Sequence, residues 1–233
     1  GFGGVTIPLV HDSPSKLGIK AVTPAPCASL VSNIATATAK FGDTMLTADA
    51  TATVRILGAP PTGGQFTTFT QGGWGSKPHG NNPGMLLQGY FPTVFPLDGV
   101  VIGGHFTRTF TSQKAIEIFL PQKRRPGVLT ESEVNPTRRT DAGEFAGQVL
   151  ALQLNVSFSD AGITLGGLGS LRVVSGKLAG HTVAEVLSLA NTVLGGPPGA
   201  LPEGVSISDL NHVVEKINRN FESGTKNHEF LAP

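Results

Sequence analysis

Histidines and carboxylates are the residues of this chain with the widest uses in catalysis and metal binding. Their spacing argues against a local catalytic motif and against a local metal site. The six histidines are spread over the sequence, and none has another at i+2, i+3 or i+4, so no local metal site is predicted. His212 falls on the polar side of a predicted helix and His181 precedes a helix start, so both are expected at the surface. A site assembled from distant residues stays open.

The motifs of common hydrolases are also incomplete. Ser170 lacks the following glycine of a nucleophile elbow. The glycine-rich run 72–77 leads to Pro78 and no helical pattern, which makes it a poor phosphate loop. The acidic residues that could pair for glycoside hydrolysis lie in one charged segment without an aromatic platform: Glu131, Glu133, Asp141 and Glu144. We therefore expect no enzyme, no metal site and no cofactor.

The only tryptophan lies in the most unusual stretch of the chain. A Thr/Phe alternation in residues 66–70 leads into glycines at 72, 73 and 75, and a turn follows at 81–84. The leading interpretation is an ordered loop that packs Trp74 against its surroundings. Aromatic rings beside amides are also typical of sugar sites, so the candidate ligand-binding residues are Trp74, Asn81, Asn82 and Tyr90.

Composition limits the partners. The 233 residues carry a formal net charge of +1 and only 14% charged residues, which argues against nucleic acid as a partner. Basic residues at 123–125 and 138–139 lie among acidic ones and are typical of a solvated loop. An apolar content of 39% excludes a disordered chain. No apolar run reaches the roughly 18 residues of a transmembrane segment.

The first half of the chain is predicted to be rich in strands. Residues 30–41 and 45–57 alternate Ala with Thr and are expected to form a hairpin around Gly42 and Asp43. Short strands are predicted between 85 and 112, including the pairs at 86–87, 90–91 and 94–95. The fold class expected from this pattern is mainly β, resembling a Gly/Thr-rich β-sandwich, with helices in the C-terminal third and α+β overall.

Helix signals occur from residue 111 onward. Thr111 and Ser112 precede a short predicted helix that ends at Pro121, and a second helical face begins at Gly143. Two capping boxes, Thr182 with Glu185 and Ser206 with Asp209, start two amphipathic helices. These helices are expected to pack together through an apolar stripe that contains Val186, Leu187, Leu210, Val214 and Ile217.

The N-terminal residues predict an arm. In residues 1–12 the apolar residues Val5, Ile7 and Leu9 alternate, and Pro8 suits an edge or donated strand. Residues 13–233 are expected to form one β-rich domain, with a possible internal boundary near 60–65. Cys27 has no partner for an intrachain disulfide. The start without Met predicts a processed, exported protein.

Several segments together resemble a module of secreted, multidomain bacterial surface proteins. They are 68–75 (TFTQGGWG), 80–84 (GNNPG), 106–111 (FTRTFT), 147–155 (GQVLALQLN), 182–190 (TVAEVLSLA) and 208–211 (SDLN). The resemblance covers about residues 66–231 and implies export from a bacterium, without an activity.

The sequence thus predicts a secreted or cell-surface structural protein that assembles into an extracellular filament, matrix or adhesive layer by β-strand addition. Self-association is the expected partnership, and a polysaccharide is a possible partner. The alternatives are a carbohydrate- or ligand-binding extracellular module and an exported hydrolase with a dispersed site.

Overall fold

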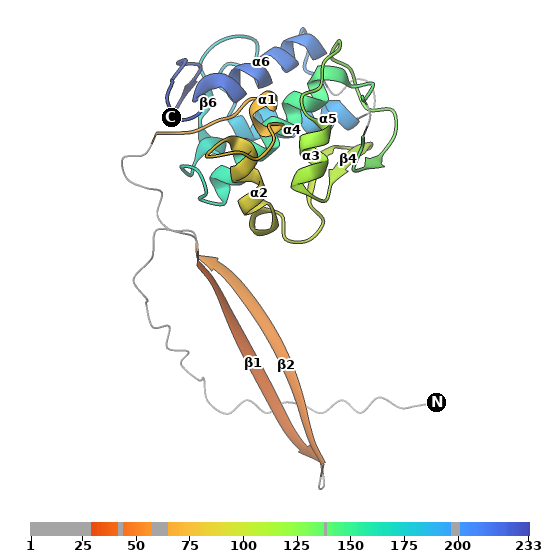
Figure 1. Cartoon of the computed structure of the whole chain (residues 1–233), viewed down its shortest axis with the longest axis vertical. Coiled ribbons are helices and arrows are strands. Elements are labelled where there is room, and N and C mark those ends of the chain that lie inside the picture. Colours follow the sequence, from red (N-terminus) through yellow and green to blue (C-terminus); the bar gives the residue numbers. More distant parts are fainter. Residues whose placement is uncertain (1–28, 42–43, 57–64, 138, 197–200) are drawn as a thin grey trace.

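The computed structural model describes residues 29–41, 44–56, 65–137, 139–196 and 201–233 (Figure 1), and only the backbone of the first two ranges. From residue 65 onward, 43% of the described residues are helical and 10% lie in strands. Beyond the hairpin, the described strands form sheets of only three and two strands. The prediction of a mainly-β, sandwich-like fold is therefore wrong. The predicted arm with Val5, Ile7 and Leu9 lies outside the described residues.

The predicted hairpin is confirmed in the backbone. Strands β1 (Ser29–Phe41) and β2 (Thr44–Ile56) pair antiparallel, with Ala35 opposite Ala50 and Ala37 opposite Ala48. The two strands form a sheet of their own, and no other described strand joins it.

Of the short strands expected between 85 and 112, the pairs at 86–87, 90–91 and 94–95 are wrong, because this part of the chain is helical. Strands do occur later in the range, at Val100–Gly103 and Thr107–Phe110. Helix α1 (Gln71–Trp74) begins at Thr70, whose hydroxyl accepts a hydrogen bond from Gly73 N, and α2 (Pro83–Val94) begins at Asn82. The amide oxygen of Asn82 accepts from Met85 N at 2.9 Å, and Pro83 occupies the first helical turn. Asn before Pro is a strong helix start, and here it outweighs the strand-like apolar pairs.

A small sheet lies beside helix α5. Strands β3 (Val100–Gly103) and β4 (Thr107–Phe110) pair antiparallel, and the short β5 (Glu133–Val134) joins β4 in parallel. The amide of Asn191 in α5 (Val183–Gly195) accepts from Gly103 N at 2.9 Å and so ties the sheet to that helix. The predicted short helix is confirmed as α3 (Gln113–Phe119), capped by Ser112.

Helix α4 (Gly143–Asp160) forms the centre of the domain, and the other helices surround it (Figure 1). Residues around its whole circumference are buried, as expected for a helix enclosed on all sides. Helix α6 (Ile207–Asn220), helix α5 and the short 3-10 helix η1 (Leu168–Ser170) pack against it. The helical face predicted from Gly143 is confirmed.

The two capping boxes are confirmed at the atomic level. The Thr182 hydroxyl and Glu185 carboxylate reciprocally cap α5, and Ser206 and Asp209 do the same for α6. The predicted docking residues of both helices are all buried: Val186, Leu187, Leu210, Val214 and Ile217.

Strands β6 (Arg172–Val173) and β7 (Leu231–Ala232) pair antiparallel and hold the C-terminal segment against the domain. Every helix in the described part of the chain is too short or too polar to cross a membrane.

Candidate functional site

Trp74 is a core residue. Its side chain is fully buried, and the indole Nε1 donates to Oδ1 of Asn155 at 3.1 Å. The ring lies 5.0 Å from that of Phe69 and 4.8 Å from that of Phe158, between centroids. The predicted packing of Trp74 is confirmed, and its ring has no face free for a ligand. The predicted loop is wrong, because residues 71–74 form the short helix α1.

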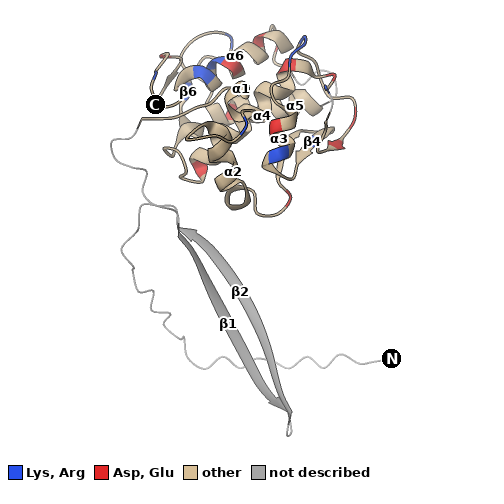
Figure 2. Cartoon of the chain, in the orientation of Figure 1, with Lys and Arg blue, Asp and Glu red and all other residues tan. Residues whose placement is uncertain are grey.

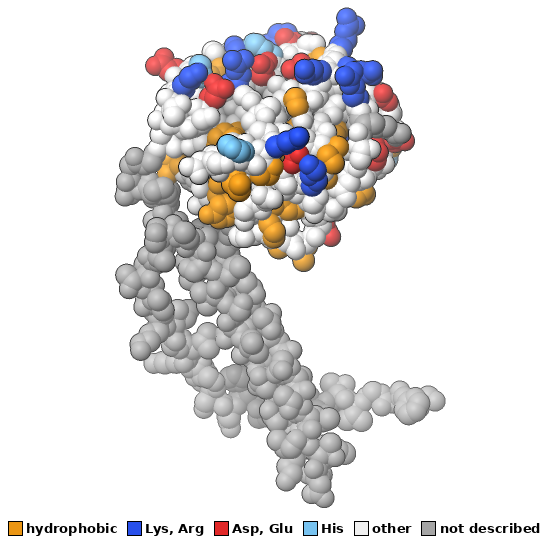
Figure 3. Space-filling view, viewed as in Figure 1, with side chains coloured by type: hydrophobic (Ala, Val, Ile, Leu, Met, Phe, Trp, Pro, Cys, Tyr) orange, Lys and Arg blue, Asp and Glu red, His pale blue; other side chains and the backbone are white. Residues whose placement is uncertain are grey.

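The four candidate ligand residues around this segment do not form one platform. Asn82 uses its amide within the chain, because Oδ1 accepts from the backbone of Met85 and Nδ2 donates to Lys77 O at 2.7 Å. Asn81 and Tyr90 are exposed. Figure 3 shows hydrophobic side chains gathered over α2 and α3, where Tyr90 and Ile118 are half exposed.

The structure adds a buried amide network that the sequence did not reveal. Asn155 of α4 is 1% exposed, and its Nδ2 donates to Phe69 O and to Asn218 Oδ1, both at 2.9 Å. Asn218 of α6 in turn donates to the backbone and side-chain oxygens of Gln148 at 3.0 Å. The network joins the segment around Trp74, α4 and α6. It is a structural element, since its three amide side chains are almost completely buried.

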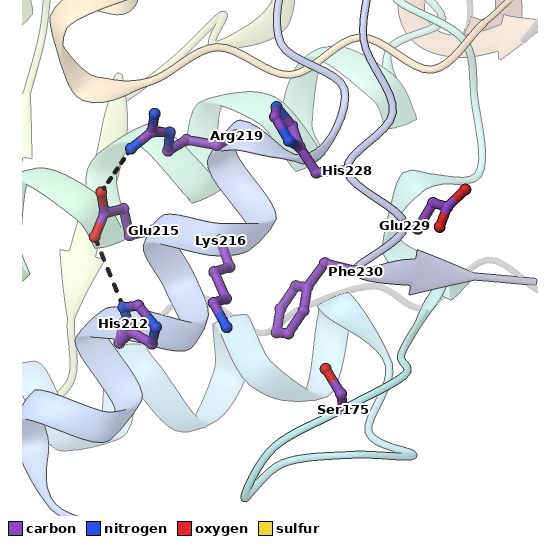
Figure 4. Close-up of a pocket in the computed structure, with 8 residues that line it drawn as sticks. All are labelled: Ser175, His212, Glu215, Lys216, Arg219, His228, Glu229 and Phe230. Carbon is purple, nitrogen blue, oxygen red and sulfur yellow. Dashed lines mark hydrogen bonds and ion pairs between the residues drawn. The ribbon is translucent and has the colours of Figure 1, made fainter.

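A cleft of about 410 Å³ runs along the polar face of α6 (Figure 4). Helix periodicity aligns four of its side chains on one face, and the C-terminal segment and the loop before α5 form the opposite wall. The residues that line it are Ser175, His212, Glu215, Lys216, Arg219, His228, Glu229 and Phe230. Sequence reasoning placed His212 on the surface but did not bring it together with His228.

One buried residue, Asn220, positions the opposite wall. Its backbone oxygen accepts from His228 N at 3.0 Å, and its Oδ1 accepts from Phe230 N at 2.8 Å. The pairing of Val173 with Leu231 in the β6–β7 sheet holds the next residues. The backbone of the C-terminal wall is therefore fixed.

The charges of the cleft are mixed. Glu215 lies between two basic groups, with Oε1 3.3 Å from Arg219 Nη1 and Oε2 4.0 Å from His212 Nδ1. Lys216 Nζ lies 5.1 Å from the centroid of the Phe230 ring, a cation–π contact. Figure 4 shows Glu229 pointing away from α6. The side chains of His212 and Arg219 are 61% and 55% exposed, so they remain available to a ligand.

The loop that carries Ser175 is anchored to the start of α6. Lys177 Nζ donates to Asp209 Oδ2 at 2.8 Å and to Gly204 O at 2.7 Å. The hydrogen bond from Lys177, and then those from Ser206, hold the pKa of the Asp209 carboxyl well below its ordinary value.

The other residues considered for chemistry lie apart from this cleft. Ser170 is in η1, and its hydroxyl donates to Gly167 O at 2.8 Å. Glu133 lies 3.9 Å from the buried Arg108, and Asp141 accepts from Thr130 at 3.2 Å. Among the described residues, no group of three or more His, Cys, Asp or Glu has a geometry that could hold a metal ion.

The chain matches no protein-family model, no curated protein and no solved structure. The resemblance to bacterial surface modules therefore stays a prediction from sequence.

Proposed function

We propose that the helical domain is a non-catalytic binding module whose α6 cleft holds a hydroxyl-rich ligand, such as a segment of polysaccharide. The observation that carries the proposal is the position of Glu215 between Arg219 and His212 on the accessible face of α6. Sugar hydroxyls donate and accept hydrogen bonds at once, so a carboxylate beside the Arg219 guanidinium and the His212 ring matches them. A net positive cleft would instead select anions.

Two features favour binding over turnover. Glu215 makes no short contact to its two neighbours, which lie at 3.3 Å (Arg219) and 4.0 Å (His212), and the side chains of both neighbours are more than half exposed. Catalytic groups need a fixed geometry within a few tenths of an ångström, which exposed side chains on a helix face do not have. Binding tolerates such freedom, since the ligand itself orders the side chains.

The role fits the expected setting of the chain. Export to a bacterial surface, expected from the sequence, would expose the module to matrix and cell-wall polysaccharides. The second wall of the cleft is backbone held by Asn220, so a polymer lying along α6 would meet one adaptable and one rigid side. The module would then attach the chain to an extracellular polymer.

Retention on insoluble polysaccharides tests this proposal. The intact chain, Arg219→Ala and Glu215→Gln would be passed over cellulose, chitin and peptidoglycan. The matched control is Lys114→Ala. It removes an exposed lysine of α3, away from the cleft, that pairs with Glu117 of the same helix. We expect one polymer to retain the intact chain and the control. Neither cleft variant should be retained by that polymer. Equal retention of all four would refute the proposal.

Assembly by strand addition is a second candidate function. Strands β1 and β2 have 13 residues each and pair only with each other among the described strands, so each has an outer edge without a described partner. Long open edges are sites for β-augmentation, and isolated hairpins are marginally stable. The proposed donor is the segment 1–12 of a second copy, with Val5, Ile7 and Leu9.

Sedimentation of a deletion variant tests the second candidate. A chain without residues 1–12 should remain folded and monomeric at concentrations where the intact chain forms polymers, and a peptide of residues 1–12 should bind the shortened chain. Polymers of equal size in both samples, or a monomeric intact chain, would contradict assembly through this segment.

A further inference from the structure

A second cavity, of about 500 Å³, lies at the start of α4, where the loop after α3 passes the first turn of that helix. Three consecutive basic side chains and one carboxylate line it together with two buried glutamines. The polar lining residues are Gln71, Gln122, Lys123, Arg124, Arg125 and Glu144. Positive charge is therefore in excess around this cavity, unlike in the α6 cleft.

Backbone contacts hold residues 123–125, the basic loop, against the start of α4. Glu144 N donates to Arg124 O at 3.2 Å, and Arg124 has a φ of 134°, which residues other than glycine rarely adopt. Gly143 makes the close approach possible, because a Cβ at this position would lie 2.4 Å from Arg125 O. The three basic side chains therefore project from a rigid backbone.

Gln122 gives an independent indication of a ligand. The residue is 5% exposed, its backbone N–H donates to Gln71 Oε1 at 2.9 Å, and its Nε2 donates to Phe119 O at 2.6 Å. Its Oε1 has no hydrogen-bond partner among the described residues. A buried acceptor without a donor is costly, so a ligand that supplies an O–H group at this wall would relieve the cost.

We propose that this cavity binds an acidic sugar, with its oxyanion toward the basic loop and a hydroxyl donating to Gln122 Oε1. The 18-residue helix α4 begins here without a side-chain cap, and its dipole adds positive potential at this end. Glu144, the only carboxylate in the lining, opposes an anion, but the three basic residues outnumber it. This site is separate from the α6 cleft and does not depend on the ligand of that cleft.

Calorimetric titration with three probes tests the site. We expect glucuronate to bind most tightly, inorganic sulfate to bind more weakly because it lacks hydroxyl donors, and glucose to bind far more weakly than glucuronate because it lacks an oxyanion. Arg125→Gln should lower the affinity for glucuronate about tenfold or more, as expected when a hydrogen bond to a charged group is lost. Lys114→Ala, an exposed change on α3 outside both sites, should leave this affinity unchanged. Glucuronate binding no tighter than glucose, or unaltered in Arg125→Gln, would overturn the proposal.

The contribution of Gln122 has its own readout. Saturating glucuronate should shift the side-chain amide NMR signals of Gln122 in the intact chain, and sulfate should shift them less. Gln122→Leu should then bring the affinity for glucuronate down to that for sulfate. A Gln122 signal that does not respond to saturating glucuronate would refute the predicted hydroxyl contact, even if the variant fails to fold.

Discussion

The indole Nε1 of Trp74 and the side-chain Oδ1 of Asn155 are joined by a buried hydrogen bond of 3.1 Å. The same oxygen accepts from Phe69 N at 2.9 Å, so one amide holds both the ring and the backbone of the segment around Trp74. Thr68 N also donates to Phe221 O at 2.9 Å, which ties the segment to the end of α6. Asn155 of α4 therefore holds the segment around the only tryptophan in place.

Asn155→Ala is expected to destabilise the domain severely. It leaves the Trp74 and Phe69 N–H groups and the Asn218 oxygen without their partner, at a cost of about 3 kcal/mol or more. Urea denaturation measures the change in the free energy of unfolding. Asn81→Ala, at an exposed position, is the control and should change it by less than about 0.5 kcal/mol. Equal effects of the two variants would contradict the structural role of Asn155.

The single tryptophan reports on the same contact. Because Trp74 is fully buried between Phe69 and Phe158, its emission should be blue-shifted in the folded chain and move to longer wavelength on unfolding. Trp74→Ala should cost about 3–5 kcal/mol, as for other aromatic truncations in cores. Emission typical of a solvated indole in the folded chain would show that the ring is not packed.

Gly147 is expected to tolerate no side chain. A Cβ at this position of α4 would lie 2.1 Å from Gln71 Oε1, which already accepts from Gln122 N. Gly147→Ala should therefore lower the free energy of unfolding by about 1–3 kcal/mol. Gly89→Ala, in α2, is the control, since its Cβ meets no atom within 4 Å and alanine favours helix. That control should be neutral or stabilising; a stabilising Gly147→Ala would contradict the close packing.

The Asp209 carboxyl should make stability depend on pH. Its pKa is lowered in the folded chain, chiefly by Lys177, so its contribution is present above the pKa of the unfolded chain and is lost as pH falls toward the folded value. The melting temperature of the intact chain should exceed that of Asp209→Asn at neutral pH, and the difference should shrink in acid below the ordinary pKa of an aspartate. A difference that grows in acid would have the wrong sign.

Local signals explain which parts of the fold the sequence predicts. Helices α5 and α6 were predicted because their capping boxes and apolar stripes lie within single segments. The segment 83–94 was predicted to form short strands because its paired apolar residues resemble strands, whereas Asn82 before Pro83 marks a helix start. The Asn82 cap and Pro83 therefore argue against a sandwich in this segment.

The candidate site depended on contacts that no local pattern contains. His228 reaches α6 only because Asn220 binds the C-terminal backbone and β7 pairs with β6. The polar face of α6 was visible in sequence, but polar helix faces are usually just solvated. The basic cavity was hidden for a similar reason, since the run 123–125 resembles an ordinary charged loop until Gly143 and Gln122 are placed beside it.

The histidine-ring NMR signals of His212 and His228 test the central claim most directly. A soluble oligosaccharide of the polymer that retains the chain would be titrated into the intact protein and into Arg219→Ala. If the α6 cleft is the binding site, both rings should shift with one saturable dependence on ligand concentration, and the variant should show no shift in that range. Saturated binding that leaves both rings unmoved would contradict the account.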